Sequence, residues 1–296
     1  QGNLDLSTKW KPENRHAVLM DQIHLSESVI GGDPDLVMWS ESSIPFIYRF
    51  AWRYRDTDND PPGYHLAVFM ETHRVPLLTG TLDMVKESLY NAAVLLRPGM
   101  PDAYYYKQKL VPFGEYIPAE CVFFFVNRLV DDSIGEFSRG ESTDPVVLPD
   151  GTRLSVTICY ENIFPSLIRR MVRSGGDVIC NLTNDAWFGD TSGPWQHFSA
   201  SCFRAVETRS PVLRCANTGI SGAVDSSGRI LHRTEFNRET AFVATVSTDP
   251  RKTLYLAAGD WFAGGCVLAA TLIYCTVFPG RSRGMDRRKR SCRKKK

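Results

Sequence analysis

The sequence predicts an α/β fold in which helices cover the faces of β-sheets. Short, nearly all-apolar runs are typical of strands buried on both faces, and they recur at residues 35–39, 91–96, 154–159, 177–182 and 211–216. Segments with helical spacing alternate with them, the clearest at residues 14–30, 164–173 and 197–208. Shorter strand candidates lie at residues 66–69, 76–79 and 241–246. Strands separated by helices indicate sheets packed under helices.

The composition limits the class of protein. The 296 residues are 43% hydrophobic and 23% charged, which is a globular balance and excludes a wholly disordered or fibrous chain. The eight cysteines include no CxxC pair, which argues against a zinc ribbon, a thioredoxin motif or a disulfide scaffold. The six histidines show no metal-ligand spacing, so we expect no metal site.

The C-terminal region carries a long uncharged segment. Residues 261–278 (WFAGGCVLAATLIYCTVF) contain no charged side chain. A helix of that length spans about 27 Å, close to the roughly 30 Å hydrocarbon core of a bilayer. We therefore expect a transmembrane helix within residues 251–280; the alternative is a buried core helix.

A strongly basic tail follows that segment. Residues 281–296 hold ten Lys or Arg and one Asp, which leaves 25 basic against 32 acidic residues in the rest of the chain. An acidic body does not fit a general nucleic-acid binder, so no nucleic-acid partner is expected. The basic run after an apolar helix predicts a cytoplasmic tail, with the body on the opposite face of the membrane.

The sequence thus divides into three expected parts: a catalytic domain at residues 1–250, a membrane segment at 251–280 and a tail at 281–296. It opens at Gln1 with no Met and no signal peptide. Because a body on the outer face must be exported, we expect the chain to be a piece of a longer protein.

Three side chains are candidates for chemistry. Cys159 ends an apolar strand just before a helical segment, where a thiol can act as a nucleophile. Glu41 follows another apolar strand and can act as a general base, and Lys107 among tyrosines can stabilise an oxyanion. The alternatives are a buried inert cysteine, a loop glutamate and a solvated lysine, with Lys109 as a competitor for the role of Lys107.

Taken together, three motifs carry a family resemblance. The segments 39–45 (WSESSIP), 105–116 (YYKQKLVPFGEY) and 157–165 (TICYENIFP) resemble, in this order, the Glu, Lys and Cys motifs of the nitrilase superfamily. More narrowly, the chain resembles the apolipoprotein N-acyltransferases. Segments 1–10, 181–198 and 203–222 match the same family.

The resemblance implies a fold and a set of site residues. The fold is a nitrilase-like αββα four-layer sandwich followed by the C-terminal membrane helix. The implied catalytic residues are Glu41, Lys107 and Cys159. Residues implied to bind substrate or support the site are Trp10, Glu115, Tyr160, Glu161 and Trp187. The family motif has a His at the position of Lys109, so which of Lys107 and Lys109 points into the site stays open.

The implied reaction is acyl transfer. A fatty acyl chain would pass from a phospholipid to the N-terminal diacylglyceryl-cysteine of a lipoprotein through a thioester on the cysteine, without a cofactor. The implied partners are the phospholipid donor, the lipoprotein acceptor and the membrane. The implied place is the bacterial inner membrane, with the catalytic domain on its outer, periplasmic face. Two alternatives are an amidase that hydrolyses a small C–N bond and a membrane-tethered binding domain with a decayed site.

Overall fold

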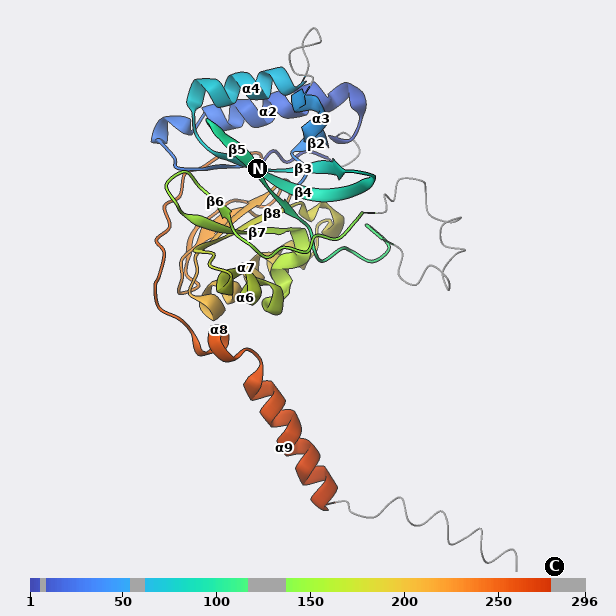
Figure 1. Cartoon of the computed structure of the whole chain (residues 1–296), viewed down its shortest axis with the longest axis vertical. Helices are drawn as coiled ribbons and strands as arrows, with labels where there is room; N and C mark the ends of the chain where they lie inside the picture. The colour runs from blue at the N-terminus through green and yellow to red at the C-terminus, as the bar shows by residue number, and fades with distance from the viewer. Residues whose placement is uncertain (6–8, 54–61, 117–136, 278–296) are drawn as a thin grey trace, which may run out of the picture. The chain divides into compact units, whose positions relative to one another are not determined.

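The structure is a computed structural model that describes residues 1–5, 9–53, 62–116 and 137–277 (Figure 1). It divides into two units, Gln1–Thr253 and Leu254–Lys296. The expected basic tail at 281–296 lies outside the described residues.

The first sheet holds the N-terminal strands of the larger unit. Its strands are β1 (Val37–Met38), β2 (Ile44–Ile47), β3 (Leu77–Val85), β4 (Ser88–Arg97) and β5 (Met100–Tyr106). Their order is β1-β3-β4-β5, with β2 also paired to β3. The β1–β3 and β2–β3 pairs are parallel, whereas β3, β4 and β5 form an antiparallel meander.

The second sheet holds the C-terminal strands of this unit. Its strands are β6 (Val146–Val147), β7 (Arg153–Ile158), β8 (Val178–Thr183), β9 (Val212–Ala216), β10 (Gly222–Val224) and β11 (Ile230–Arg233). The order is β11-β10-β9-β8-β7-β6, and the central strands β7, β8 and β9 run parallel. Parallel strands end at the same edge of a sheet, so the residues after β7 and β8 lie near one another.

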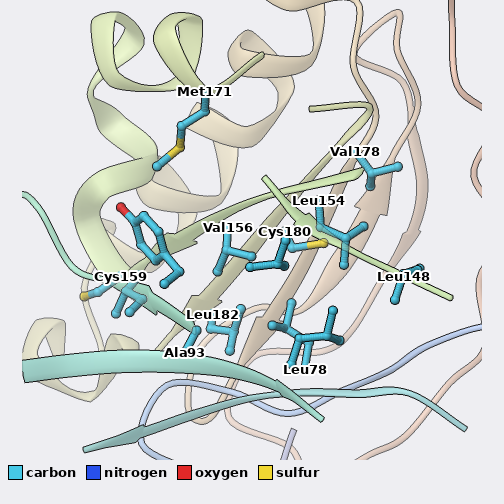
Figure 2. Packing of buried hydrophobic residues seen from close by; sticks show 14 of the residues in the cluster. Leu78, Ala93, Leu148, Leu154, Val156, Cys159, Met171, Val178, Cys180 and Leu182 are labelled. Atoms are coloured by element: carbon cyan, nitrogen blue, oxygen red, sulfur yellow. The ribbon is translucent and has the colours of Figure 1, made fainter. Parts of the chain in front are cut away.

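The two sheets pack face to face through a shared apolar core. Leu78 and Ala93 of the first sheet lie in one cluster with Leu154, Val156 and Leu182 of the second (Figure 2). Each of these side chains is at most 2% exposed. Burial of this kind contributes about 25 cal/mol per Å² of apolar surface, so this layer is a main source of stability.

Helices cover both outer faces. On the first sheet lie α2 (Arg15–Glu27) and α4 (Pro62–His73), and on the second lie α6 (Pro165–Arg173) and α7 (Gly193–Thr208) (Figure 1). The described residues of this unit also form α3 (Tyr48–Arg53) and the short 3-10 helices η1 (Pro12–Asn14), η2 (Ile30–Gly32), η4 (Cys159–Ile163) and η5 (Asp185–Phe188). The predicted α/β sandwich of four layers is confirmed.

Two of the shorter strand predictions are wrong. Residues 66–69 belong to helix α4, where Leu66, Phe69 and Met70 are buried and Val68 is 42% exposed. That spacing of three and four residues is helical, and a four-residue window is too short to reveal it. Residues 241–246 form no strand: side chains there alternate in exposure, but no described strand pairs with their backbone.

The smaller unit corrects the prediction of a single membrane span within residues 251–280. It contains α8 (Leu254–Ala258) and α9 (Trp261–Val277), which are separate helices because Gly259 between them has a left-handed φ of 64°. Among the residues the structure describes, no helix combines the length and apolarity needed to cross a membrane. The apolar side chains of α9 are all exposed.

Candidate active site

Three strand ends bring the candidate residues together. Glu41 follows β1, Lys107 directly follows β5, and Cys159 directly follows β7. Their exposed fractions are 8%, 1% and 9%, so all three are buried. Glu41 and Lys107 come from the first sheet and Cys159 from the second, and the site therefore lies where the edges of the two sheets meet.

Lys107 lies between two carboxylates. Its Nζ donates to Glu115 Oε1 at 2.8 Å and to Glu41 Oε1 at 3.5 Å. Asn91, on β4, joins the same group, because its Nδ2 donates to Glu41 Oε1 at 3.0 Å and to Glu115 Oε1 at 2.9 Å. An ammonium and an amide thus share two buried acceptors, which offsets the repulsion between the carboxylates.

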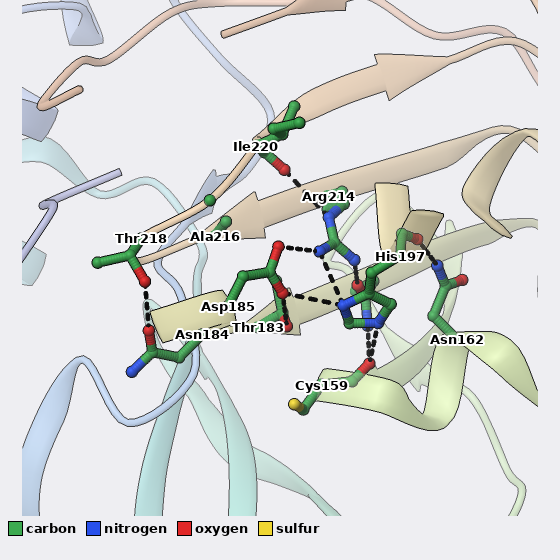
Figure 3. A network of polar contacts seen from close by, with 12 residues as sticks. Cys159, Asn162, Thr183, Asn184, Asp185, His197, Arg214, Ala216, Thr218 and Ile220 are labelled. Atoms are coloured by element: carbon green, nitrogen blue, oxygen red, sulfur yellow. Dashed lines mark hydrogen bonds and ion pairs between the residues drawn. The ribbon is translucent and has the colours of Figure 1, made fainter. Parts of the chain in front are cut away.

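Cys159 occupies a strained turn at the end of β7. Its φ is 55°, a left-handed value that is uncommon for a residue with a Cβ. Such strain is typical of a nucleophile at a strand-to-helix junction. The backbone carbonyl of Cys159 accepts from His197 Nε2 at 3.2 Å and from Asn181 Nδ2 at 3.1 Å (Figure 3).

The surroundings set the protonation of the thiol and the ammonium. Burial, followed by the charge of Glu41, raises the pKa of Cys159 to about 12, against the opposing charge of Lys107. Burial alone would lower the pKa of Lys107, but its electrostatic interactions with Glu41, Cys159 and Glu115 raise it above its ordinary value. At neutral pH the free site therefore holds a neutral thiol and a charged lysine, so a base must remove the thiol proton.

Glu161 is a structural carboxylate. It is fully buried, and its Oε1 accepts from the backbone N–H groups of Gln108 and Lys109 at 2.7 and 2.9 Å. Its Oε2 accepts from the Ile158 N–H at 2.8 Å and from the Tyr105 hydroxyl at 2.9 Å. Glu161 thus ties the segment after Lys107 to the residue before Cys159.

The other implied residues lie in different surroundings. The Tyr160 hydroxyl donates to the Leu110 carbonyl at 2.6 Å, and Lys107 Nζ lies 5.7 Å from the centre of its ring. Lys109 Nζ instead lies 5.5 Å from the centre of the Phe164 ring, so Lys107 is the lysine that contacts the carboxylates. Trp10 and Trp187 are 39% and 79% exposed. Among the described residues, neither tryptophan makes a hydrogen bond or ring contact with the three candidate catalytic side chains.

Three contributors were missed in the sequence. Asn91 falls within a predicted strand, and a single polar residue at the start of an apolar run is too common to indicate a role. Lys9 is 1% exposed, and its Nζ donates to the Glu41 carbonyl at 2.8 Å. Burial lowers the pKa of Lys9 to about 8. Gly80, on β3, has no side chain to signal a role, yet a Cβ there would lie 2.4 Å from the Ser42 nitrogen and 2.7 Å from the Glu41 Cα.

Replacing Gly80 by alanine, which adds this Cβ, provides a first test. We expect Gly80→Ala to destabilise the fold by about 1–3 kcal/mol, since the atoms it meets belong to the backbone and cannot turn aside. Thermal unfolding measures this loss. Gly31→Ala, where the added Cβ meets no atom within 4 Å, is the matched control. Equal unfolding temperatures for the two variants would contradict this reading.

Comparison with known proteins identifies the family. The model of the carbon-nitrogen hydrolase family matches residues 6–253. An apolipoprotein N-acyltransferase of Geobacter metallireducens is 36% identical over 291 residues, covering 95% of this chain and 53% of that protein. One from Rhizobium rhizogenes is 38% identical over 249 residues, covering 79% of this chain and 44% of that protein. The chain thus spans about half the length of these relatives.

A solved structure supports the fold independently. The crystal structure of a carbon-nitrogen hydrolase from Helicobacter pylori G27 superposes with a TM-score of 0.57 at 15% sequence identity. The match covers 76% of this chain and 82% of that chain. Because the family model covers most of the sequence, this protein belongs to the carbon-nitrogen hydrolase family.

Proposed function

We propose that this chain forms the catalytic part of an apolipoprotein N-acyltransferase, with Glu41, Lys107 and Cys159 as its catalytic residues. The observation that carries the proposal is the meeting of a buried carboxylate, an ammonium and a thiol at three strand ends. The similarity to two N-acyltransferases over most of the chain favours acyl transfer over amide hydrolysis. The donor is a phospholipid and the acceptor is the N-terminal diacylglyceryl-cysteine of a lipoprotein.

The first half-reaction acylates the enzyme. Glu41 takes the proton of the Cys159 thiol, and the sulfur attacks the ester carbonyl of the phospholipid. Lys107 and a backbone N–H near Tyr160 stabilise the tetrahedral oxyanion. The carbon–oxygen bond of the ester breaks, and Glu41 returns the proton to the departing lysophospholipid. A thioester remains on Cys159.

The second half-reaction regenerates the thiol. The α-amino group of the lipoprotein attacks the thioester, and Glu41 takes a proton from that nitrogen. Collapse of the tetrahedral intermediate forms the amide bond and expels the sulfur, which regains a proton from Glu41. Trp10, Glu115, Tyr160 and Trp187 support or contact the substrates in this proposal. No cofactor takes part.

Removing the nucleophile tests this route. We expect Cys159→Ala to abolish the acyl-enzyme, because no other group in the site can form the thioester. The measurement is the transfer of a labelled acyl chain from phospholipid vesicles to the protein, followed by release with hydroxylamine, which cleaves thioesters. A labelled adduct on the variant would refute the assignment. Turnover of a small amide without phospholipid would instead support the amidase alternative.

The proposal also places the chain at the bacterial inner membrane. The support is the exposed apolar surface of α9, which includes Leu268 and Leu272 at 61% and 58% exposure. Water disfavours such a surface, and lipid is its natural partner. We expect the double variant L268E/L272E to lose much of its co-flotation with phospholipid vesicles. Unchanged flotation would contradict a lipid-binding role for α9.

A further inference from the structure

The Cys159 carbonyl is held by two buried side chains from different elements. Asn181 lies on β8 and His197 on α7, and their exposed fractions are 0% and 3%. Both donate to the same oxygen, at 3.1 and 3.2 Å. We call this pair the carbonyl clamp.

One buried ion pair orients both members of the clamp (Figure 3). Arg214 Nη2 donates to Asp185 Oδ2 at 2.7 Å, and Asp185 Oδ1 lies 2.9 Å from His197 Nδ1. Arg214 Nη1 donates to Asn181 Oδ1 at 2.6 Å. This last bond fixes the amide orientation, because Asn181 Oδ1 must face the guanidinium and Nδ2 must then face Cys159.

The turn at Cys159 explains why this carbonyl needs partners. The β7–β8 ladder ends at the Ile158–Leu182 pair, so the carbonyl of Cys159 lies beyond the strand pairing. A residue in the left-handed conformation at this position points its carbonyl into the protein. Without a hydrogen-bond donor to that oxygen, the backbone of residue 159 would favour an ordinary conformation. Two donors on that oxygen oppose this relaxation.

We propose that Asn181 and His197 are positioning residues that lock the left-handed turn of Cys159 and thereby keep its thiol turned toward Glu41 and Lys107. The inference rests on the proposed role of Cys159 as the nucleophile. Neither side chain touches the reacting atoms; both act through the backbone of residue 159. Donation by His197 requires a hydrogen on Nε2, whatever the state of Nδ1.

Two substitutions at residue 197 separate this role from a general structural one. In His197→Gln the amide nitrogen reaches the position of Nε2, so it can still donate to the Cys159 carbonyl. In His197→Asn the shorter amide reaches only the position of Nδ1, so it keeps the contact with Asp185 and loses the carbonyl. If His197 serves only to contact the Asp185–Arg214 pair, His197→Asn should be the less harmful of the two variants. If His197 holds the Cys159 carbonyl, His197→Gln should be the less harmful.

The readout is the rate of alkylation of Cys159 by iodoacetamide in the full chain, measured by peptide mass spectrometry. Cys180, which is fully buried, serves as the internal reference. We expect Cys159 to react faster than Cys180 in the unsubstituted chain. His197→Asn should lower the alkylation rate of Cys159 about tenfold, which corresponds to the loss of one hydrogen bond. His197→Gln should lower this rate much less. Asn181→Asp, which replaces the second donor by an acceptor, should also slow it about tenfold and tests the clamp independently.

Equal rates for His197→Asn and His197→Gln, or an undiminished rate in Asn181→Asp, would overturn the inference. So would a Cys159 that reacts no faster than Cys180 in the unsubstituted chain. A chain whose Cys159 is alkylated quickly but accepts no acyl group from phospholipid would refute the proposed function and leave the clamp standing.

Discussion

Replacing Lys107 by methionine should abolish acyl-enzyme formation. The variant keeps an unbranched apolar side chain but removes the only cation that contacts both Glu41 and Glu115 among the described residues. Loss of one oxyanion donor typically lowers a rate by about 10²–10³. The charge of Lys107 also opposes the rise in the pKa of Cys159, so its removal makes the thiol a weaker acid. The two effects act in the same direction.

Single-turnover transfer of a labelled acyl chain measures this loss. Lys109→Met is the matched control, since that ammonium lies against the Phe164 ring and not between the carboxylates. We expect the control to keep its rate within a few-fold. An active Lys107→Met variant together with an inactive Lys109→Met variant would reverse the assignment of the two lysines. Thermal unfolding of Lys107→Met should also show destabilisation, because two buried carboxylates lose their cation.

Replacing Arg214 by methionine should produce the largest loss of stability. The side chains of Arg214 and Asp185 are both 0% exposed, and Nη2 lies 2.7 Å from Asp185 Oδ2. Removing one partner of such a pair leaves an uncompensated buried charge, which costs about 3–5 kcal/mol. The unfolding temperature and the denaturant midpoint should both fall. Arg238→Met, which breaks an exposed pair with Glu235, is the control and should change them little.

The pH dependence of this loss has a definite sign. Burial alone would raise the pKa of Asp185, but Arg214 and His197 hold it below its ordinary value. A carboxyl with a lowered native pKa contributes stability above its unfolded pKa, near 3.9, and loses that contribution as the pH falls through the native value. The stability difference between the unsubstituted chain and Arg214→Met should therefore be full at neutral pH and shrink below about pH 4. A difference that grew on acidification would contradict this account.

Much of the fold could be predicted from local pattern. The apolar runs that became β4, β7, β8 and β9 are short, rich in branched residues and bounded by turns, so their burial on both faces follows from composition. Two strand predictions failed, one because the sequence segment was too short to show its period and one because the segment has no described strand to pair with. Residues 66–69 follow helical spacing only when Met70 is included, and residues 241–246 lack a neighbouring strand.

The position of the C-terminal apolar helix could be predicted, since α9 begins at Trp261, the first residue of the uncharged segment 261–278. Hydropathy does not register backbone turns, so the sequence did not show that Gly259, with its left-handed φ, separates α8 from α9.

By itself, the sequence determined which residue types the site contains, that Glu41 and Cys159 each follow an apolar strand, and that Lys107 lies among tyrosines. Only the tertiary structure decided that Lys107, and not Lys109, contacts the carboxylates, that Glu161 is tied to backbone N–H groups, and that Asn91 joins Glu41 to Glu115. The physical reason is how far apart along the chain the interacting residues lie. Strand formation depends on neighbouring residues along the chain, whereas hydrogen bonds between strand ends depend on sheet order and register, which bring together residues more than 50 positions apart.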